Sequence, residues 1–382
     1  MKKIYLDYAA TTPVDPEVLE AMKPYFLEKY GNAGSLHSFG QEARDALEKA
    51  RNVISKFIGA RSSEIIFTGV GTEANNLAIK GIAFANKDKG KHIITSKIEH
   101  PAILEPCKWL EKQGFRVTYL PIDAEGLVRV KDVETAISDD TILVSIMFAN
   151  NEIGTIQKIK EIGDICKKHK VYFHTDAVQA FGKIPIDVKK MNIDLLTASA
   201  HKIYGPKGVG MLYVDSKVKI EPILHGGGHE TGLRSGTENI AGVVGFAKAV
   251  EMANKEMKSE MKRQQILRDK IISNLLQMPG TRLNGSKTER LPNNVNISFI
   301  GVEGEALLIR LNQEGLAVST GSACSSKSLE PSHVLLALGL KPEEAHGSLR
   351  ITLGKYTTDE DVDKLIEVLP KIIKSLRKIS PF

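Results

Sequence analysis

The sequence is poor in cysteine, in aromatic residues and in long apolar runs. Its 382 residues include three cysteines and one tryptophan, and aromatic residues make up 6%. Cys107, Cys166 and Cys324 lie far apart, so they suggest neither a disulfide framework nor a CxxC metal site. No apolar run reaches membrane-spanning length, and the apolar patch in MKKIYLDYAATTP is too short for a signal peptide. These absences predict a protein of the reducing cytoplasm with no membrane segment.

The sequence also lacks a strong excess of one charge. Lysine and arginine number 52 against 46 acidic residues, and no basic run is dense enough for a nucleic-acid surface. The mild basic excess is a weak sign of acidic protein partners. A hydrophobic content of 42% is that of a globular protein, and the length favours two domains.

Apolar segments alternate with amphipathic ones over the middle of the chain. Strands are expected at 64–69, 91–100, 115–122, 141–150, 171–177, 194–200 and 208–215. Helices are expected at 72–86, 101–114, 130–137 and 159–170. Alternation with continuously apolar strands predicts an α/β fold, in which helices cover both faces of a mostly parallel sheet.

A second alternation follows a long helical pattern at 240–278. Strands are expected at 293–300, 316–321 and 347–354, and helices at 303–315, 330–339 and 358–379. We therefore expect a large domain over residues 15–255. A smaller α/β domain would combine residues 1–14 with 256–382 and carry an exposed loop at about 320–333.

Lys202 is the first candidate for covalent chemistry. It lies in TASAHKIYGPKGVG (197–210), between an apolar run and a Gly-Pro turn. A poorly solvated lysine is a nucleophilic amine, as a Schiff base to an aldehyde cofactor requires; a solvated surface lysine is the alternative. Ligands of parallel sheets bind beyond the strand ends. The polar residues expected there are Thr72, His100, Asn151, Asp176, Ser199 and His201.

Two further patterns suit an aromatic cofactor that carries a phosphate. Asp176 follows an apolar strand and could pair with a protonated pyridine nitrogen, with Gln179 near a ring oxygen; a helix N-cap is the alternative for Asp176. FTGVGTEANN (67–76) presents backbone N–H groups and a helix N-terminus to a phosphate, unless it is an ordinary capped turn. Ser199, His201 and Thr237 would complete this phosphate site.

Three other residues are candidates for substrate chemistry. His100 could stack on the cofactor or move protons, or it could be a turn histidine. Cys324, in STGSACSSKSLEPSH (319–333), lies among small residues and could ionise and attack, whereas Cys107 and Cys166 look like packing residues. Arg350 interrupts an apolar strand and could bind a substrate carboxylate, with an internal salt bridge as the alternative.

Several motifs along the whole chain resemble those of one family. They are YLDYAATTP, GTEANN, the EH at 99–100, NNEIGT, HTDAVQA, SAHKIYGPKGVG, GGGHETGLRSGT, STGSACSS and LRITLG. On these motifs the chain resembles the cysteine desulfurases of the NifS/IscS type. These belong to the class V aminotransferases and are fold-type I enzymes of pyridoxal 5'-phosphate. The chain departs from the usual Ser-Gly-Ala-Thr-Glu of the family, with GVGTE at 69–73.

The resemblance implies a role for each candidate residue. Lys202 would hold pyridoxal 5'-phosphate covalently, Asp176 and Gln179 would bind its ring, and His100 would stack on it. The remaining cofactor residues would be Thr72, Glu73, Asn151, Ser199, His201 and, from a second subunit, Thr237. Asn151 and Arg350 would bind the substrate carboxylate, and Cys324 would be the nucleophile.

The implied reaction removes sulfur from L-cysteine and leaves L-alanine. Lys202 would remove the α-proton, and Cys324 would become a persulfide that passes its sulfur to an iron–sulfur scaffold protein. The family also implies a homodimer and no metal in the isolated chain, although Cys324 could ligate a cluster in a complex. Two alternatives stay open at this point, namely a selenocysteine lyase and a non-catalytic sulfur carrier or scaffold.

Overall fold

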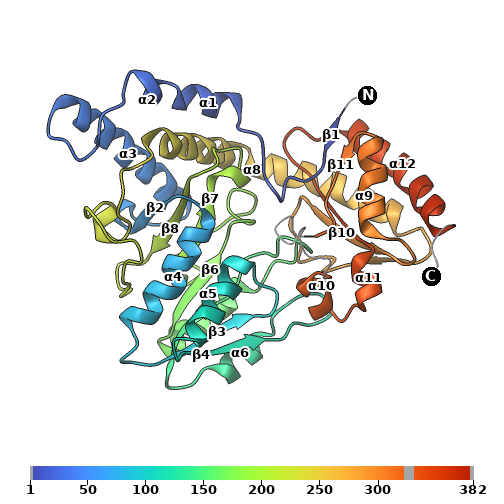
Figure 1. Ribbon diagram of the computed structural model, residues 1–382, viewed down its shortest axis with the longest axis horizontal. Coiled ribbons are helices and arrows are strands. Elements are labelled where there is room, and N and C mark those ends of the chain that lie inside the picture. Colours follow the sequence, from blue (N-terminus) through green and yellow to red (C-terminus); the bar gives the residue numbers. More distant parts are fainter. Residues whose placement is uncertain (1–2, 322–330, 379–382) are drawn as a thin grey trace.

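The fold is built on a seven-stranded sheet with the strand order β2-β8-β7-β6-β5-β3-β4 (Figure 1). The computed structural model describes residues 3–321 and 331–378. The strands of this sheet are β2 (Ile65–Thr68), β3 (His92–Ser96), β4 (Arg116–Leu120), β5 (Thr141–Ser145), β6 (Tyr172–Asp176), β7 (Leu195–Ser199) and β8 (Gly210–Val214). Each expected strand of this region is therefore present, although most are shorter than the apolar segments that predicted them.

The expectation of a mostly parallel sheet is confirmed. Strands β3 to β7 pair in parallel with their neighbours, whereas β8 runs antiparallel to both β2 and β7. The chain between Ser199 and Gly210 holds only the 3-10 turn η2 (Ala200–Lys202) and a tight loop. A parallel crossover needs a longer connection that passes over the sheet, so this short link returns β8 antiparallel.

Helices cover both faces of the sheet, because successive strand side chains point to opposite sides. Ile65 and Phe67 belong to the apolar core on one face, and Ile66 between them belongs to the core on the other. The first core is shared with α3, α6, α7 and α8, and the second with α4 and α5. The helices span α3 (Ser38–Phe57), α4 (Gly71–Ala85), α5 (Pro101–Glu111), α6 (Val130–Ala136), α7 (Ile159–His169) and α8 (Ile240–Leu275).

A separate core surrounds a smaller antiparallel sheet with the order β12-β10-β9. The sheet and its helices comprise β9 (Thr281–Leu283), β10 (Asn294–Phe299), β12 (Ser348–Thr352), α9 (Gly304–Gln313) and α12 (Asp359–Arg377). The second half of α8 packs into this core through Leu267 and Ile271, while its first half packs on the large sheet through Phe246. The long helix thus spans both cores. The exact domain limits at residues 15 and 255 stay a prediction.

The N-terminal segment joins the smaller core. Its strand β1 (Ile4–Tyr5) pairs in parallel with β11 (Leu316–Ala317), and Ile4 and Leu6 are buried with the residues of β10 and β12. The chain then turns toward the large sheet and enters α1 (Pro16–Met22), where Asp15 accepts a hydrogen bond from the N–H of Glu17. Asp15 is therefore the N-cap of α1, and a short helix α2 (Pro24–Leu27) follows.

Two expectations for the C-terminal part need correction. The strand expected at 316–321 is only two residues long, because its pairing with β1 ends at Ala317. The helix expected at 330–339 is the short α10 (His333–Ala337), which stops before Gly339 with its φ of 83°. A further helix, α11 (Pro342–His346), begins at a proline. Within the described ranges, no helix is both long enough and apolar enough to cross a bilayer.

A buried ion pair fastens the loop after β8 to the large domain's core. Arg51 of α3 meets both carboxylate oxygens of Glu230 at 2.8 Å, and Glu230 also accepts the N–H of Phe67 at 2.7 Å. The Glu230 side chain is 2% exposed. On its other side Arg51 meets Glu48 at 3.1 Å, and the Glu48 side chain is 56% exposed.

This geometry predicts unequal costs for removing the two partners of Arg51. Glu230→Ala leaves a buried guanidinium without its main anion and should lower the free energy of unfolding by about 3–5 kcal/mol. Glu48→Ala removes a solvent-screened partner of the same arginine and should cost less than about 1 kcal/mol. Urea unfolding followed by circular dichroism measures both variants. Equal midpoints for Glu230→Ala and Glu48→Ala would contradict the assignment.

Candidate active site

Lys202 lies at the end of the turn that follows β7. Its Nζ donates hydrogen bonds to the carbonyl oxygens of Ala9 at 2.5 Å and Ala10 at 2.7 Å. These carbonyls belong to the N-terminal segment, which the pairing of β1 with β11 holds in place. Lys202 is partly buried, so the surface lysine considered as the alternative is not what the structure shows. The amine sits at the carboxyl edge of the large sheet, where parallel strands open into ligand sites.

Asp176 ends the neighbouring strand β6 and is held on both carboxylate oxygens. Oδ2 accepts from Asn75 Nδ2 at 2.7 Å, and Oδ1 accepts from the N–H of Val178 at 3.0 Å. The second bond caps a turn rather than a helix, since no helix begins here. The residue is 6% exposed. A buried carboxylate with a fixed orientation is suited to accept a hydrogen bond from a protonated ring nitrogen.

His100 is the N-cap of α5. Its Nδ1 accepts the N–H of Ala102 at 3.1 Å. Burial is the main cause that lowers the pKa of His100; the charges of Lys202 and His333 lower it further, and Asp176 acts in the opposite sense. The imidazole therefore lies within the electrostatic reach of both Asp176 and Lys202. Because Nδ1 acts as an acceptor, Nε2 carries the proton of the neutral ring.

Two of the expected phosphate residues, Thr72 and Ser199, lie at the N-terminus of α4. Thr72 stands in its first turn and lines one open groove together with His100. Ser199 is buried, and its hydroxyl has no hydrogen-bond partner among the described residues. His201 Nδ1 contacts Thr11 Oγ1 at 3.1 Å, and burial lowers the pKa of His201 to about 4, which keeps the ring neutral. A side chain on Gly71 would meet Val178 Cγ2 at 3.0 Å, so the turn must approach this strand end closely.

Gln179 meets Lys202 at a shared acceptor. Its Nε2 donates to the Ala9 carbonyl at 2.9 Å, and this is the same oxygen that Lys202 contacts. Gln179 is 6% exposed. The structure thus brings together the lysine, the amide and the N-terminal backbone at one point.

Arg350 is buried in β12 beside the same N-terminal segment. Its Nη2 forms an ion pair with Asp7 at 2.9 Å, its Nη1 donates to the Asn151 carbonyl at 3.0 Å, and its Nε has no partner. The internal salt bridge considered as an alternative is therefore present. Asn151 contributes its backbone rather than its amide to Arg350. The unsatisfied Nε shows that this guanidinium still has a donor to offer.

Two of the expected cofactor residues have other surroundings. Glu73 pairs with Arg234 at 2.7 Å and accepts the N–H of Gly69 at 2.9 Å, so it braces the loop that precedes α4. Thr237 is exposed in the connection before α8. Neither position shows a role at the Lys202 site within this single chain.

Cys324 lies outside the described residues, but the chain on both sides of it is placed. Ser319 pairs with Arg350, and Ser332 donates to Glu152 Oε2 at 2.5 Å. His333 Nε2 contacts the carbonyl of Glu99, the residue before His100, at 3.0 Å. Both flanks therefore reach the candidate site.

The two described cysteines do not suit nucleophilic chemistry. Cys107 and Cys166 are both buried, in α5 and α7. Burial raises the pKa of Cys107 to about 12 and raises the pKa of Cys166 as well. A thiol with such a pKa is not ionised at neutral pH, so the packing role expected for both is confirmed.

Some residues of the site carried no signal that sequence reasoning used. Asp7 and Asn75 lie within the motifs YLDYAATTP and GTEANN, but their partners are distant in the sequence. Glu99 is fully buried and accepts from Ser96 and from the N–H of Met147, while its Oε2 has no partner. Burial raises the pKa of Glu99 to about 8. Its neighbour His100 was a candidate, and the buried acid beside it was not.

Comparisons with known proteins agree with this geometry. The model of the family "Aminotransferase class-V" matches residues 4–365. The chain is 58% identical over 383 residues to "Cysteine desulfurase IscS" of Clostridium botulinum strain Hall, which covers 100% of this chain and 96% of that protein.

Solved structures give the same result. A "NIFS-LIKE PROTEIN" superposes with a TM-score of 0.91 at 42% identity and covers 98% of this chain and 99% of its own. "SspA in complex with cysteine" superposes with a TM-score of 0.82 at 41% identity, covering 94% of this chain and 100% of its own. The match of sequence and fold over nearly the whole length means that the chain belongs to the class-V aminotransferase family, among its cysteine desulfurases of the NifS/IscS type.

Proposed function

We propose that the chain is a cysteine desulfurase that uses pyridoxal 5'-phosphate to convert L-cysteine into L-alanine and protein-bound sulfur. The observation that carries the proposal is the meeting of Lys202, Gln179 and the Ala9 carbonyl close to Asp176 and His100. A relative that bears the name cysteine desulfurase is 58% identical to this chain, and the match covers 100% of the chain.

The residues present fit this cofactor. Ser199 has a buried hydroxyl without a partner beside the N-terminus of α4, which suits a phosphate. Asp176 offers a fixed carboxylate to the ring nitrogen. We assign the covalent attachment to Lys202 and stacking to His100. Thr72, Ser199 and His201 would hold the phosphate, and Gln179 would hold the ring oxygen.

The chain's own residues would divide the proton transfers. When bound, pyridoxal phosphate supplies an electron sink for the charge left by removal of the substrate's α-proton. The amine of Lys202 takes that proton, and the carbonyls of Ala9 and Ala10 fix where the amine stands. Because His100 Nδ1 accepts the N-cap bond from Ala102, the proton of the ring is on Nε2. His100 can donate this proton toward the substrate sulfur.

Arg350 and Cys324 would handle the substrate itself. The unsatisfied Nε of Arg350 suits the cysteine carboxylate, with Asn151 alongside. The Cys324 thiolate would attack the substrate sulfur, so that a new S–S bond forms as the bond between Cβ and sulfur breaks. Its electron pair stays with the carbon skeleton, which is protonated and leaves as alanine. The persulfide would then pass to an acceptor, for which an iron–sulfur scaffold protein is our candidate.

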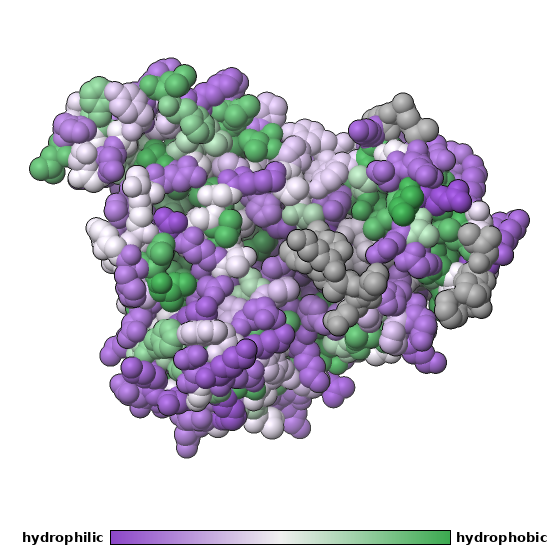
Figure 2. Space-filling model, in the orientation of Figure 1, coloured by the Kyte–Doolittle hydropathy of each residue, from purple (hydrophilic) through white to green (hydrophobic). Residues whose placement is uncertain are grey.

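We further propose that two copies of the chain form a homodimer. Apolar side chains are exposed over α1, α2 and the start of α3, where Figure 2 shows a green area at the upper left. The residues of this surface are Leu19, Phe26, Leu27, Tyr30, Leu36 and Phe39. A monomeric protein rarely exposes so many neighbouring apolar side chains. Thr237, exposed in this chain, would complete the phosphate site of the second copy.

Lys202→Ala tests the cofactor attachment. The purified protein should be yellow and release alanine from cysteine, and the variant should lose the visible absorption band and at least about 100-fold of the alanine formation. Lys207→Ala is the matched control, because Lys207 is an exposed lysine in the following loop. An absorption band that survives in Lys202→Ala after extensive dialysis would reject the assignment.

Cys324→Ser tests the sulfur acceptor. The variant should keep the absorption band and lose persulfide formation, which labelling with a thiol-reactive probe followed by mass spectrometry measures. Cys166→Ala serves as the control, since that thiol is buried and un-ionised. Sulfide release from cysteine at the full rate by Cys324→Ser, without added thiol, would show that another group accepts the sulfur.

A further inference from the structure

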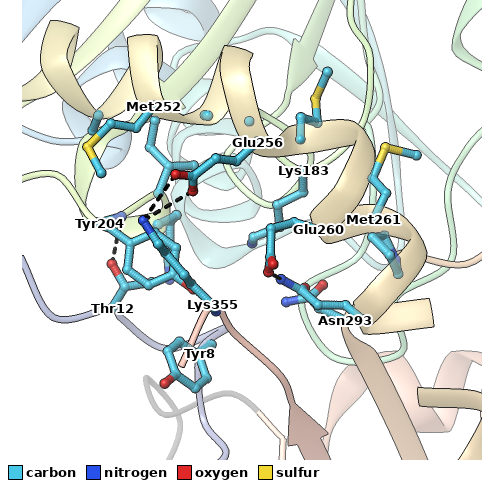
Figure 3. A pocket seen from close by; sticks show the side chains of 18 of the residues that line it. Tyr8, Thr12, Lys183, Tyr204, Met252, Glu256, Glu260, Met261, Asn293 and Lys355 are labelled. Carbon is cyan, nitrogen blue, oxygen red and sulfur yellow. Dashed lines mark hydrogen bonds and ion pairs between the residues drawn. The ribbon is translucent and has the colours of Figure 1, made fainter. Parts of the chain in front are cut away.

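Lys183 is a partly buried lysine that the proposed reaction does not use. It follows the turn after β6 and forms part of the wall of a cavity beneath α8 (Figure 3). Three methionines of α8, Met252, Met257 and Met261, line the same cavity. Within residues 3–321 and 331–378, Lys183 makes no ion pair. Withdrawing a lysine amine from water without a carboxylate partner is costly, so its presence calls for a physical reason.

The acidic residues of this cavity are engaged elsewhere. Lys355 pairs with Glu256 at 3.1 Å and with Asp15 at 3.3 Å, and the dashed lines of Figure 3 mark the first of these contacts. Glu260 pairs with Arg263 at 2.9 Å. The charges that act on Lys183 are those of Lys202 and Arg350, and both repel it.

Both side-chain hydrogen bonds of Lys183 to the described residues go to Gln179. Its Nζ donates to the backbone carbonyl of Gln179 at 3.1 Å and to the side-chain Oε1 at 3.2 Å. The other end of the same amide, Nε2, donates to the Ala9 carbonyl at 2.9 Å, which Lys202 also contacts. A continuous hydrogen-bonded path therefore runs from Lys183 through Gln179 and Ala9 to Lys202.

This arrangement fixes which way the Gln179 amide faces. A charged lysine can donate hydrogen bonds but cannot accept them, and a backbone carbonyl can only accept. A flipped amide would set Nε2 against the lysine and Oε1 against the carbonyl of Ala9, so both hydrogen bonds would be replaced by repulsive contacts. With Lys183 absent, only the Ala9 carbonyl would oppose the flip.

We propose that Lys183 is a positioning residue that holds the donor end of Gln179 toward Lys202 and the ring oxygen of the cofactor. The inference rests on the proposed function, because it concerns how that cofactor is received. Burial and the two repelling cations lower the pKa of Lys183 to about 7. The charged amine opposes the flip directly because it has no lone pair, whereas against a neutral amine only the Ala9 carbonyl opposes the flip, so the positioning is strongest below this pKa.

The test uses Lys183→Met, which keeps the length of the side chain and removes the donor. The apo protein's Kd for pyridoxal 5'-phosphate should rise about fivefold, as expected for loss of one hydrogen bond. The apparent pKa of the visible absorption band should rise by about half a unit or more, because a donor and a repelling cation are lost. Lys183→Gln keeps a donor at this position and should recover most of the affinity.

A double-variant cycle separates positioning from a general structural effect. In a Gln179→Leu background, Lys183→Met should change the Kd less than about twofold, because the amide through which it acts is gone. The apo form of Lys183→Met should unfold at the same temperature as the parent or higher, since an apolar side chain replaces a partly buried cation that has no carboxylate partner among the described residues. Lys190→Met is the matched control, as the Lys190 side chain is 83% exposed.

Each outcome has a defined meaning. An unchanged Kd in Lys183→Met, or an equal loss in the Gln179→Leu background, overturns the role of Lys183. A lower unfolding temperature of apo Lys183→Met with a parallel loss of affinity overturns it also, in favour of a structural role. If the parent chain itself binds no pyridoxal phosphate, the proposed function fails, and this result is read before any variant is compared.

Discussion

The contact between the Lys202 amine and the carbonyl oxygens of Ala9 and Ala10 is the constraint on which the site depends. Neither carbonyl belongs to the large sheet that carries Lys202. Both lie on the N-terminal segment, whose first strand is fixed in the smaller core by β11. The position of the Lys202 amine therefore depends on how the two cores are placed relative to each other. The same segment supplies Asp7 to Arg350 and an acceptor to Gln179, so three functional side chains share one backbone support.

Much of this arrangement could be predicted from the sequence, because it depends on local patterns. Apolar periodicity marked β6 and β7, and the rule that ligands bind at strand ends then selected Asp176 and Lys202. The contacts that orient these side chains could not be found in this way. Asn75 and Asp176 are 101 residues apart, and Asp7 and Arg350 are 343 apart. Such pairs depend on how helices and sheets pack, which periodicity does not encode.

The buried polar groups of the site fall into two classes. Asp176 and Gln179 are held at both ends by hydrogen bonds, which fixes their geometry before a ligand arrives. Ser199 Oγ and Arg350 Nε instead have no partner among the described residues although they are buried. An unsatisfied buried donor or acceptor is unfavourable in the free protein. Binding of a phosphate or a carboxylate would remove that cost, so the same atoms favour the ligand.

The pairing of β1 with β11 also has a consequence for synthesis of the chain. The ribosome makes Ile4 and Tyr5 more than 300 residues before their partners Leu316 and Ala317. Until then, the segment that carries Ala9 and Ala10 has no strand to hold it against Lys202. The large sheet can form while the nascent chain is still growing, but the N-terminal side of the site can be completed only after Leu316 and Ala317 have been made. Maturation of this pocket is thus a late event, set by the order in which its two supporting strands are made.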